Sequence, residues 1–218
     1  MDFGDLRRLA PLSRAFGADR GRPIDRHYIE GFLAANAADV RGRVLEFGDD
    51  SYLRRFGGER VSRADVCYPL AGHPSATLVA DLASPGSLGR ERFDCIICTQ
   101  VLMYVYEVRT AIGTLHDALA PGGTLLATFP GISQLSPLDF ERFGEFWRFT
   151  RASAARLFAE AFAGGTVAVQ SHGNVLAAIA FLEGLTCAEL SDAELDHHDP
   201  LYEVTVTVRA TRPRAPGS

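Results

Sequence analysis

The feature that most constrains the fold is the alternation of short apolar segments with segments of helical periodicity. Apolar runs typical of β-strands occur at 43–47, 60–66, 76–82, 93–100, 124–129 and 166–172. Segments with helical spacing of apolar residues occur at 25–40, 50–56, 106–119, 151–162 and 174–185. Because parallel strands need crossover connections, usually helices, this alternation predicts a mostly parallel sheet with helices on both faces.

A seventh strand is predicted at 202–210, where apolar and polar residues alternate in "YEVTVTVRA". Alternation is typical of a strand with one exposed face, so we expect an antiparallel strand near the sheet edge. The fold class is therefore predicted as α/β: a Rossmann-like, doubly wound, mostly parallel seven-stranded sheet with an antiparallel last strand. The amphipathic segment 25–40 is expected to form an N-terminal helical cap.

The length of 218 residues and the hydrophobic content of 47% fit one globular domain with a full core. We expect an N-terminal arm or helix at 1–24, one domain at 25–210 and a disordered tail at 211–218. No apolar run approaches the roughly 18 residues that span a bilayer, and the N-terminus lacks a signal-peptide pattern. A cytoplasmic protein without membrane contact is predicted, and the net charge of −5 argues against general nucleic-acid binding.

All 22 basic residues are arginine, and the chain contains no lysine. A genome-wide codon bias is the simplest cause, but the chemical consequence is the same whatever the cause. Without lysine the chain can form no Schiff base with a substrate or a pyridoxal cofactor, and it has no Walker-type phosphate lysine. Those two classes of enzyme are excluded.

Cys95 and Cys98 form a C-x-x-C pattern that could indicate redox or zinc chemistry. However, "FDCIICTQ" at 93–100 is typical of a buried strand, and residues three apart on a strand face opposite sides. The two thiols are therefore expected in the core on opposite faces of the sheet. No metal site and no disulfide is predicted.

Ligands of open α/β sheets bind outside the carboxyl ends of the strands, and here those ends are acidic. The first predicted strand ends in Glu46 and Phe47, followed by Gly48, Asp49 and Asp50. A pyrophosphate at this turn would lie a few ångströms from two aspartates, which costs on the order of 1 kcal/mol each. A ligand with a positive centre is favoured instead.

Two further acids end the next strands. Asp65 ends the second predicted strand 19 residues after Glu46, close to the ~20-residue spacing of a ribose-binding acid. Asp81 ends the third predicted strand. A cofactor with a ribose diol, an adenine and a cationic centre but no phosphate fits this rim, and S-adenosylmethionine has that composition.

The order of "VLEFG", "RADV", "VADL", "FDCIICTQVLMYV" and "LHDALAPGGTLLATFPG" resembles the class I S-adenosylmethionine-dependent methyltransferases. The resemblance is closest to the methyltransferase type 11 group, in particular a bacterial branch with a "LEIGDxxYTRRFGG"-like first motif. It covers roughly 25 to 210. The proline-glycine-glycine turn before the fifth strand is its most specific signal, and the acid after the second strand is a moderate one.

The resemblance implies S-adenosylmethionine as the cofactor and assigns residues to it. In that family the first motif borders the methionine moiety, here at Glu46, Phe47 and Gly48. The acid after the second strand holds the ribose hydroxyls, here Asp65. Residues after the third and fourth strands flank the adenine, the rest of the cofactor and the substrate, here Asp81, Leu82, Thr99, Gln100 and Val101.

An aromatic segment, "ERFGEFWRFT" at 141–150, falls where that family builds its acceptor pocket. We expect Trp147 and Arg148, together with Tyr104, to bind the acceptor. An aromatic wall with one cation would suit a sugar or a phenolic acceptor, including an anionic one. The alternative is hydrophobic packing beneath a long loop.

The candidate general base is His198 oriented by Asp199, within "DHHDPLY" at 196–202. A solvated loop before the last strand is an equally good interpretation of this cluster. Of the other histidines, His27 lies on the predicted N-terminal helix, which could cover the cofactor, and His172 ends the sixth predicted strand. His73 and His116 are interpreted as surface residues.

These observations predict S-adenosylmethionine-dependent methylation of a small molecule, at oxygen, with a sugar or secondary metabolite as acceptor. Asp49, Asp50 and Ser51 replace the glycine-rich continuation of the family motif. That departure motivates an alternative, a catalytically inactive methyltransferase-like partner or regulatory subunit. A nicotinamide-dependent oxidoreductase is a further alternative, disfavoured by the acids at the first turn. A homodimer is one option for the assembly, which the sequence does not determine.

Overall fold

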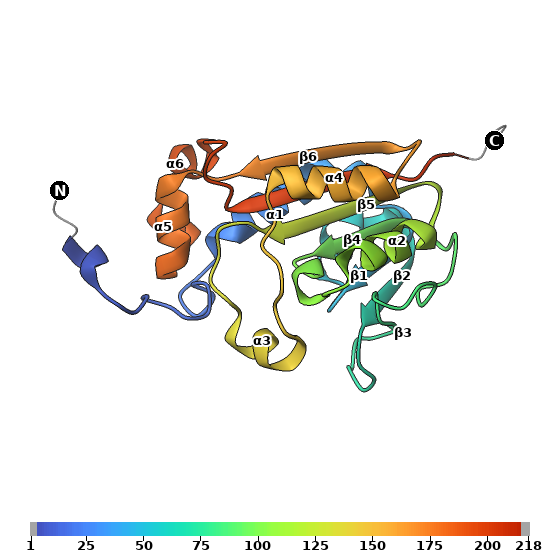
Figure 1. Ribbon diagram of the computed structural model, residues 1–218, viewed down its shortest axis with the longest axis horizontal. Coiled ribbons are helices and arrows are strands. Elements are labelled where there is room, and N and C mark those ends of the chain that lie inside the picture. Colours follow the sequence, from blue (N-terminus) through green and yellow to red (C-terminus); the bar gives the residue numbers. More distant parts are fainter. Residues whose placement is uncertain (1–3, 215–218) are drawn as a thin grey trace.

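The computed structural model describes residues 4–214, apart from the side chains of Asp5 and Leu6, and its strands form one mixed sheet (Figure 1). The seven strands lie in the order β3-β2-β1-β4-β5-β7-β6. Their bounds are β1 Gly42–Phe47, β2 Val61–Tyr68, β3 Leu78–Val79, β4 Phe93–Thr99, β5 Leu119–Pro130, β6 Thr166–His172 and β7 Thr205–Thr211. The pairs from β3 to β5 are parallel, and β7 is antiparallel to both β5 and β6. The predicted Rossmann-like sheet with an antiparallel last strand is confirmed.

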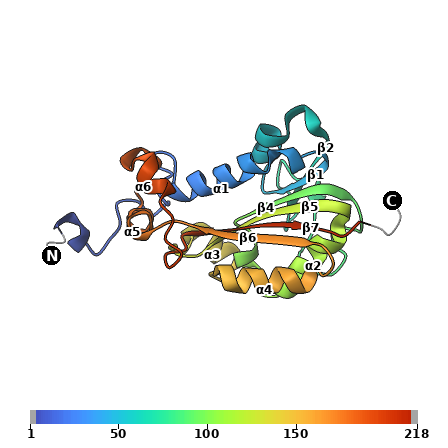
Figure 2. The same cartoon turned by 90° about the horizontal axis from the view of Figure 1, so that it is seen from above.

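The α-helices cover both faces of the sheet, with α1 on one face and α2 and α4 on the other (Figure 2). Their bounds are α1 Ile24–Ala35, α2 Val108–Ala118, α3 Pro137–Phe143, α4 Arg151–Ala161, α5 Val175–Glu183 and α6 Asp192–Asp196. Shorter turns are η1 Gly4–Arg7, η2 Ala37–Asp39, the π-helix η3 Leu53–Gly57, η4 Gly58–Arg60, η5 Leu102–Tyr104 and η6 Cys187–Glu189. None of the helices in residues 4–214 combines the length and apolar character that a bilayer crossing requires.

The apolar spacing of α1 determines which face of the sheet it covers. Ile29 and Leu33 are fully buried against β1, β4 and β5, where they meet Val44 and Ile97 among others. Burial of one such side chain contributes about 1.5–3 kcal/mol. The other end of α1 packs on α5, so the predicted N-terminal cap is a helix that lies along one sheet face and reaches beyond its edge.

The two core thiols lie on opposite sides of β4, as their spacing predicts. Cys95 belongs to the apolar cluster under α1, and Cys98 belongs to the cluster under α2 and α4. Both are free and fully buried, and burial raises the pKa of each thiol. A buried thiol with a raised pKa is an inert core residue.

Several predicted boundaries are wrong, among them the end of the helix predicted at 25–40, which stops at Ala35. The second strand runs to Tyr68, two residues past the predicted end at 66. Only Leu78–Val79 of the predicted strand 76–82 pairs with a neighbour. The proline-glycine-glycine triplet lies inside β5, because α2 already ends at Ala118 and the strand begins at the next residue.

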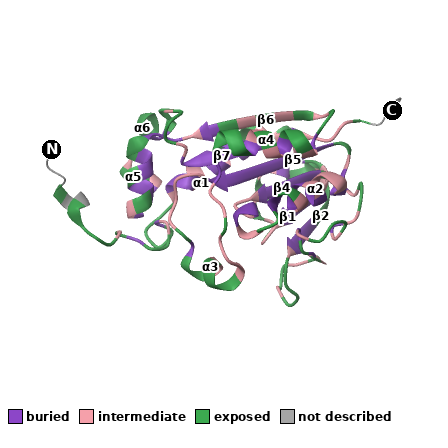
Figure 3. Ribbon diagram, in the orientation of Figure 1, coloured by how far each residue is buried: buried purple, intermediate pink, exposed green. Residues whose placement is uncertain are grey.

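The last strand is antiparallel and lies near the sheet edge, as expected. β7 lies between β5 and β6, and β6 forms the edge itself. The first five residues of β6 alternate between exposed and half-buried, whereas most of β7 is buried (Figure 3). The predicted tail 211–218 divides between the end of β7, the described residues 212–214 and residues outside the described part.

Candidate active site

The turn after β1 is built around Gly48, whose φ of +90° favours glycine. Its N–H donates to the carbonyl of Cys67 at 3.1 Å, which ties the turn to β2. A Cβ at this position would meet no atom within 4 Å. The glycine is therefore required by backbone conformation, and the space above it is open to a ligand.

Glu46 stabilises the segment after this turn through hydrogen bonds to its backbone. Its carboxylate accepts the backbone N–H groups of Leu53 at 2.7 Å and Tyr52 at 3.2 Å. The side chain is buried, and burial raises its pKa to about 8, against the lowering effect of the two N–H groups. Glu46 thus holds the start of η3 against β1, and it is not among the residues that line the adjoining cavity.

The two aspartates that replace the expected glycines have partners within their own turn. Asp49 accepts the N–H of Ser51 at 2.8 Å, and Asp50 pairs with Arg54 at 2.5 Å. Asp50 and Arg54 are four residues apart, a spacing that brings side chains together on one turn of helix. The pair begins the short helical stretch that sequence periodicity predicts near 50–56.

A cavity of about 510 Å³ opens at the carboxyl ends of β1, β2 and β4. Eight of the residues predicted for the cofactor or the substrate line it: Phe47, Gly48, Asp81, Leu82, Thr99, Gln100, Val101 and Tyr104. Cys67, Tyr68 and Ala80 complete the wall beside β2 and β3. We call this space the first cavity.

Asp65 is not brought to the first cavity. It lies inside β2, pairs with Arg43 at 2.7 Å and with Arg63 at 3.4 Å, and is buried. The physical reason is register: Asp65 is opposite Leu45 in β1, two residues before the strand ends. The end of β2 is formed by Tyr68, which stacks on His73 with ring centroids 4.2 Å apart.

Gln100, the residue directly after β4, has a strained backbone conformation. Its φ of +54° lies in the left-handed region, which is uncommon for a residue other than glycine. The backbone N–H donates to the carbonyl of Thr128 at 3.0 Å, which holds the conformation. Such strain is found at functional sites more often than elsewhere. Sequence periodicity contains no signal for it.

A second cavity of about 270 Å³ adjoins the first and shares Gln100, Tyr104 and Asp139 with it. Its other charged lining residues are Asp25 and Arg26 from α1, and Glu145 from the loop after α3. Sequence reasoning missed these residues. The one available signal was the predicted N-terminal helix, which begins at this point.

Trp147 and Arg148, predicted to bind the acceptor, line neither cavity. Trp147 donates its indole N–H to the carbonyl of Val105 at 3.0 Å and stacks on Tyr106. Arg148 pairs with Glu145 at 2.7 Å and donates to the carbonyl of Gln134. Both residues hold the loop after α3, which carries Glu145 of the second cavity. These contacts agree with the alternative of packing beneath a long loop.

His198 and Asp199 lie apart from both cavities. His198 borders a shallow pocket with Arg151 and residues of β6, and its Nε2 is 3.5 Å from the hydroxyl of Ser171. Asp199 accepts the N–H of Leu201 at 3.0 Å within its own turn. The structure therefore does not bring the predicted base pair to the site, and the solvated-loop interpretation describes its surroundings.

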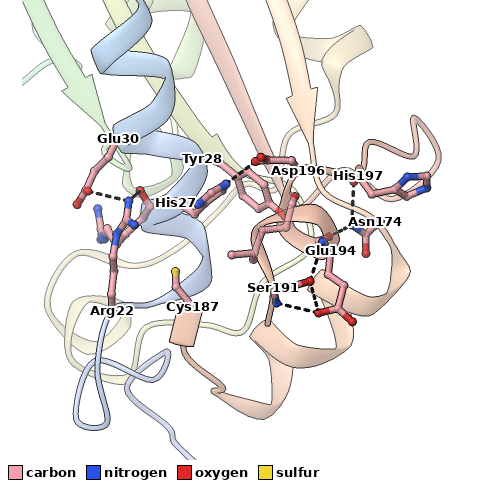
Figure 4. Close-up of polar contacts among 12 residues, drawn as sticks. Arg22, His27, Tyr28, Glu30, Asn174, Cys187, Ser191, Glu194, Asp196 and His197 are labelled. Carbon is pink, nitrogen blue, oxygen red and sulfur yellow. Dashed lines mark hydrogen bonds and ion pairs between the residues drawn. The ribbon is translucent and has the colours of Figure 1, made fainter. Parts of the chain in front are cut away.

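A histidine-carboxylate pair does occur nearby, at the contact of α1 with α6 (Figure 4). His27 Nε2 is 2.7 Å from a carboxylate oxygen of Asp196, and Tyr28 donates to the carbonyl of Leu195 at 3.0 Å. Tyr28 stacks on His172, whose pKa is lowered to about 4, mainly by burial. None of these four side chains lines either cavity, so they join α1 to α6 and β6 rather than form the site.

A larger hollow, about 720 Å³, lies at the opposite end of the strands. Its lining includes Asp94, Thr124 and Arg209. Ligands of parallel sheets bind at the carboxyl ends, so this hollow is not the expected site despite its size. Across residues 4–214, no three His, Cys, Asp or Glu side chains are grouped so that they could hold a metal ion.

Residues 34–127, which include β1 to β4 and most of β5, match the family model described as a methyltransferase domain. This part of the chain matches a methyltransferase domain, and the sheet has the fold of class I S-adenosylmethionine-dependent methyltransferases. S-adenosylmethionine is the cofactor of the methyltransferase domain. The first cavity lies within this match for most of its lining, from Phe47 to Glu107.

Solved structures agree on the fold of the methyltransferase. The N-methyltransferase NodS from Bradyrhizobium japonicum WM9, in complex with S-adenosyl-L-homocysteine, is 17% identical and aligns over 89% of this chain and 90% of its own, with a TM-score of 0.56. A SAM-dependent methyltransferase from Archaeoglobus fulgidus is 9% identical over 86% and 94%, with a TM-score of 0.55.

A putative methyltransferase from Haloferax volcanii, in complex with the Trm112 methyltransferase activator, is 14% identical over 95% and 100%, with a TM-score of 0.53. At such identities these likenesses concern the fold alone. No curated protein matches the chain.

The residues of the first cavity are compatible with the cofactor. Gly48 leaves open space beside the backbone, and Leu82 and Val101 supply an apolar wall of the kind that a purine ring needs. Asp81 supplies a carboxylate in the lining, with one oxygen already accepting the N–H of Ala83 at 2.9 Å. The strand end that Asp65 was expected to occupy presents Tyr68 instead.

Proposed function

We propose that the chain transfers a methyl group from S-adenosylmethionine to an oxygen atom of a small molecule. The observation that carries this proposal is the pair of adjoining cavities at the carboxyl ends of the strands, which share Gln100 and Tyr104. The second cavity, about 270 Å³, has room for a small acceptor or one end of a larger one. A sugar or a secondary metabolite fits this description.

In this proposal Phe47 and Gly48 border the methionine end of the cofactor, and Asp81 with Leu82 borders the nucleoside. Thr99 and Val101 border the cofactor in the first cavity. Gln100 lies between the cofactor and the acceptor, because it lines both cavities. Glu46 acts as a positioning residue, because its carboxylate holds η3 and the turn at Gly48.

When bound, the cofactor supplies a methyl group that is already activated for displacement. The chain's own contribution is to orient the acceptor and exclude water, and such positioning can supply most of the rate enhancement. The strained backbone at Gln100 and the loop that carries Tyr104 form the boundary at which the acceptor must be held. No step of this proposal requires a base at His198 or Asp199.

Titration calorimetry with S-adenosylmethionine, S-adenosylhomocysteine and NAD tests the cofactor site. We expect binding of both sulfur nucleosides and none of NAD. We expect Asp81→Asn to weaken S-adenosylhomocysteine binding about tenfold, because a charged hydrogen-bond acceptor is lost. Asp192→Asn, an exposed aspartate on α6, is the matched control and should change nothing. NAD binding in place of the sulfur compounds would overturn the proposal.

A catalytically inactive partner subunit is the second candidate. It is favoured by the ribose-side strand end, where Tyr68 stands and the nearest acid of β2 is paired with arginine instead. Tight cofactor binding without methyl transfer to any acceptor in a panel of sugars, phenols and amines, followed by mass spectrometry, would support this candidate over the first.

A further inference from the structure

We propose that the second cavity binds the methyl acceptor through Asp25 and selects acceptors that donate a hydroxyl or amine hydrogen bond and carry no negative charge. This inference rests on the proposed function and adds the substrate class. It replaces the sequence-based expectation that Arg148 receives an anionic acceptor.

Asp25 is a buried carboxylate with an unused oxygen. It lies in the first turn of α1, is 9% exposed and lines the second cavity. Its Oδ1 accepts no hydrogen bond from residues 4–214, and the closest charged atom is Arg26 Nε at 3.7 Å. A buried acceptor without a donor is unfavourable, and Oδ1 has almost no accessible surface here, so a ligand removes this penalty when the carboxylate of Asp25 turns toward the cavity that the residue lines.

The charges that face the cavity favour a neutral or cationic ligand. Three carboxylates line it, on Asp25, Asp139 and Glu145, against the single guanidinium of Arg26. Arg148 neutralises Glu145 from outside the lining, at 2.7 Å. The positive charge of Arg26 offsets the negative charge of Asp25, so the lining keeps one net negative charge, that of Asp139.

Arg26 offers little to an anion. Its guanidinium lies 3.7 Å from Asp25 and donates to the hydroxyl of Tyr52 at 3.3 Å. Glu30, one turn further along α1, adds another negative charge that raises the pKa of Asp25 further, although burial is the main cause. A carboxylate or phosphate entering here would meet Asp25 and Asp139 as well as Arg26.

The position of Asp25 relative to the first cavity suits an acceptor-binding role. Gln100, Tyr104 and Asp139 belong to both cavities, so a ligand held at Asp25 extends toward the first cavity. Asp139 is already held in place, because its Oδ2 accepts from Ser136 at 2.8 Å and Tyr104 at 3.2 Å. Among the described residues of this wall, Asp25 contributes the buried side-chain oxygen that has no hydrogen-bond donor, Oδ1.

Two matched probe sets test the proposal on the full chain saturated with S-adenosylhomocysteine, by ligand-observed NMR titration. The first set is benzylamine, benzyl alcohol and benzoate, and the second is glucosamine, glucose and glucuronate. In each set the framework is constant while the polar group is cationic, neutral or anionic. We expect an amine or hydroxyl member of at least one set to bind at least tenfold more tightly than its carboxylate analogue.

Variants locate the binding. Asp25→Asn should weaken amine binding at least tenfold, and Asp25→Ala should weaken both amine and hydroxyl binding at least threefold. Asp192→Asn is the matched control and should bind all probes as the wild type does.

Equal or tighter binding of the carboxylates, no binding of any amine or alcohol, or unchanged affinities in both Asp25 variants would overturn the proposal. The wild-type comparison stands even if one variant does not fold. Calorimetry separates this inference from the proposed function, because Asp25→Asn should leave S-adenosylhomocysteine affinity within threefold of wild type. Failure of the wild type to bind S-adenosylhomocysteine would count against the proposed function itself.

Discussion

Two buried carboxylates near the first cavity differ in what they face. Glu46 faces two backbone N–H groups, whereas Asp65 faces the guanidinium groups of Arg43 and Arg63. Both lie below the ligand-facing surface, and neither lines the cavity. Each is therefore expected to act on the site through the backbone that it holds.

The raised pKa of Glu46 makes stability depend on pH. Between its ordinary value of 4.5 and about 8 the folded chain binds this proton and the unfolded chain does not, so stability falls as pH rises. His172, with its pKa lowered to about 4, has the opposite effect up to its ordinary 6.5. Between pH 6.5 and 8, therefore, the fall in stability caused by Glu46 is not offset by His172.

We expect urea unfolding of the wild type to lose stability over that window, by at most about 1.4 kcal/mol per pH unit. Glu46→Gln, which does not titrate, should remove this slope. His172 is unchanged in the variant, so the slope below pH 6.5 should steepen in the positive direction. An identical pH profile for the two proteins would contradict the assignment.

Asp65→Asn should separate stability from cofactor binding. Removing the charge leaves Arg43 without its carboxylate partner in a mostly buried position, which costs about 3 kcal/mol. Because Asp65 does not line the first cavity, S-adenosylhomocysteine affinity should stay within threefold in calorimetry. A tenfold loss of affinity would restore the ribose role that sequence spacing suggests.

The error at Asp65 shows the limit of sequence reasoning at this scale. The acid was placed by its distance in the chain from Glu46, but its position depends on where β2 stops. The strand continues through Cys67 to Tyr68, so it ends three residues beyond the acid. Phe47 and Gly48 line the first cavity, because the glycine turn itself marks the end of the strand.

At the scale of elements, side-chain caps fix the helices at the carboxyl end of the sheet. Asn174 caps α5 by accepting the N–H of Ala177 at 3.0 Å, and its amide donates to the carbonyls of Glu194 and His197 (Figure 4). One side chain thereby joins α5 to α6. Ser191 caps α6 in a more exposed position.

We expect Asn174→Ala to lower the free energy of unfolding by about 2–3 kcal/mol, from one lost cap and two lost buried hydrogen bonds. Ser191→Ala, a cap without the link between helices, should cost about 1 kcal/mol or less. Chemical denaturation measures both. Equal effects of the two substitutions would show that the link between α5 and α6 contributes nothing.

Elements with a strong periodic pattern were predicted well. Elements whose bounds depend on hydrogen bonding to a neighbouring strand were predicted less well. The strand 166–172 and the helix 151–162 match β6 and α4 closely, because their apolar spacing is complete within the segment. The predicted strand 76–82 yields only Leu78–Val79, since an edge strand forms only where its neighbour offers a partner. The position of β7 inside the sheet likewise depends on two other strands.

At the scale of the whole molecule, the site combines segments that are far apart in the sequence. The second cavity takes Asp25 from α1 and Glu145 from the loop after α3, so no local pattern could have revealed it. The first cavity was predictable because the topology of a parallel sheet brings its strand ends together. Periodicity thus predicted where the first cavity lies, whereas the second cavity could be found only from the structure.

Cofactor binding should stabilise the whole fold. S-adenosylhomocysteine at 100 times its dissociation constant adds about 2.7 kcal/mol to the free energy of unfolding. For a chain of this size that raises Tm by roughly 5–10 °C, measured by scanning calorimetry. NAD at the same concentration should give no shift, and Asp81→Asn should shift less at equal ligand concentration.

The strand order has a consequence for how the chain is made. β6 pairs only with β7, so the edge strand has no hydrogen-bonded neighbour until Thr205–Thr211 emerge from the ribosome. The first five strands can assemble during synthesis, while the segment 166–172 must wait with its backbone unpaired. Protection of nascent chains from protease should therefore reach β6 only in the last stage of translation.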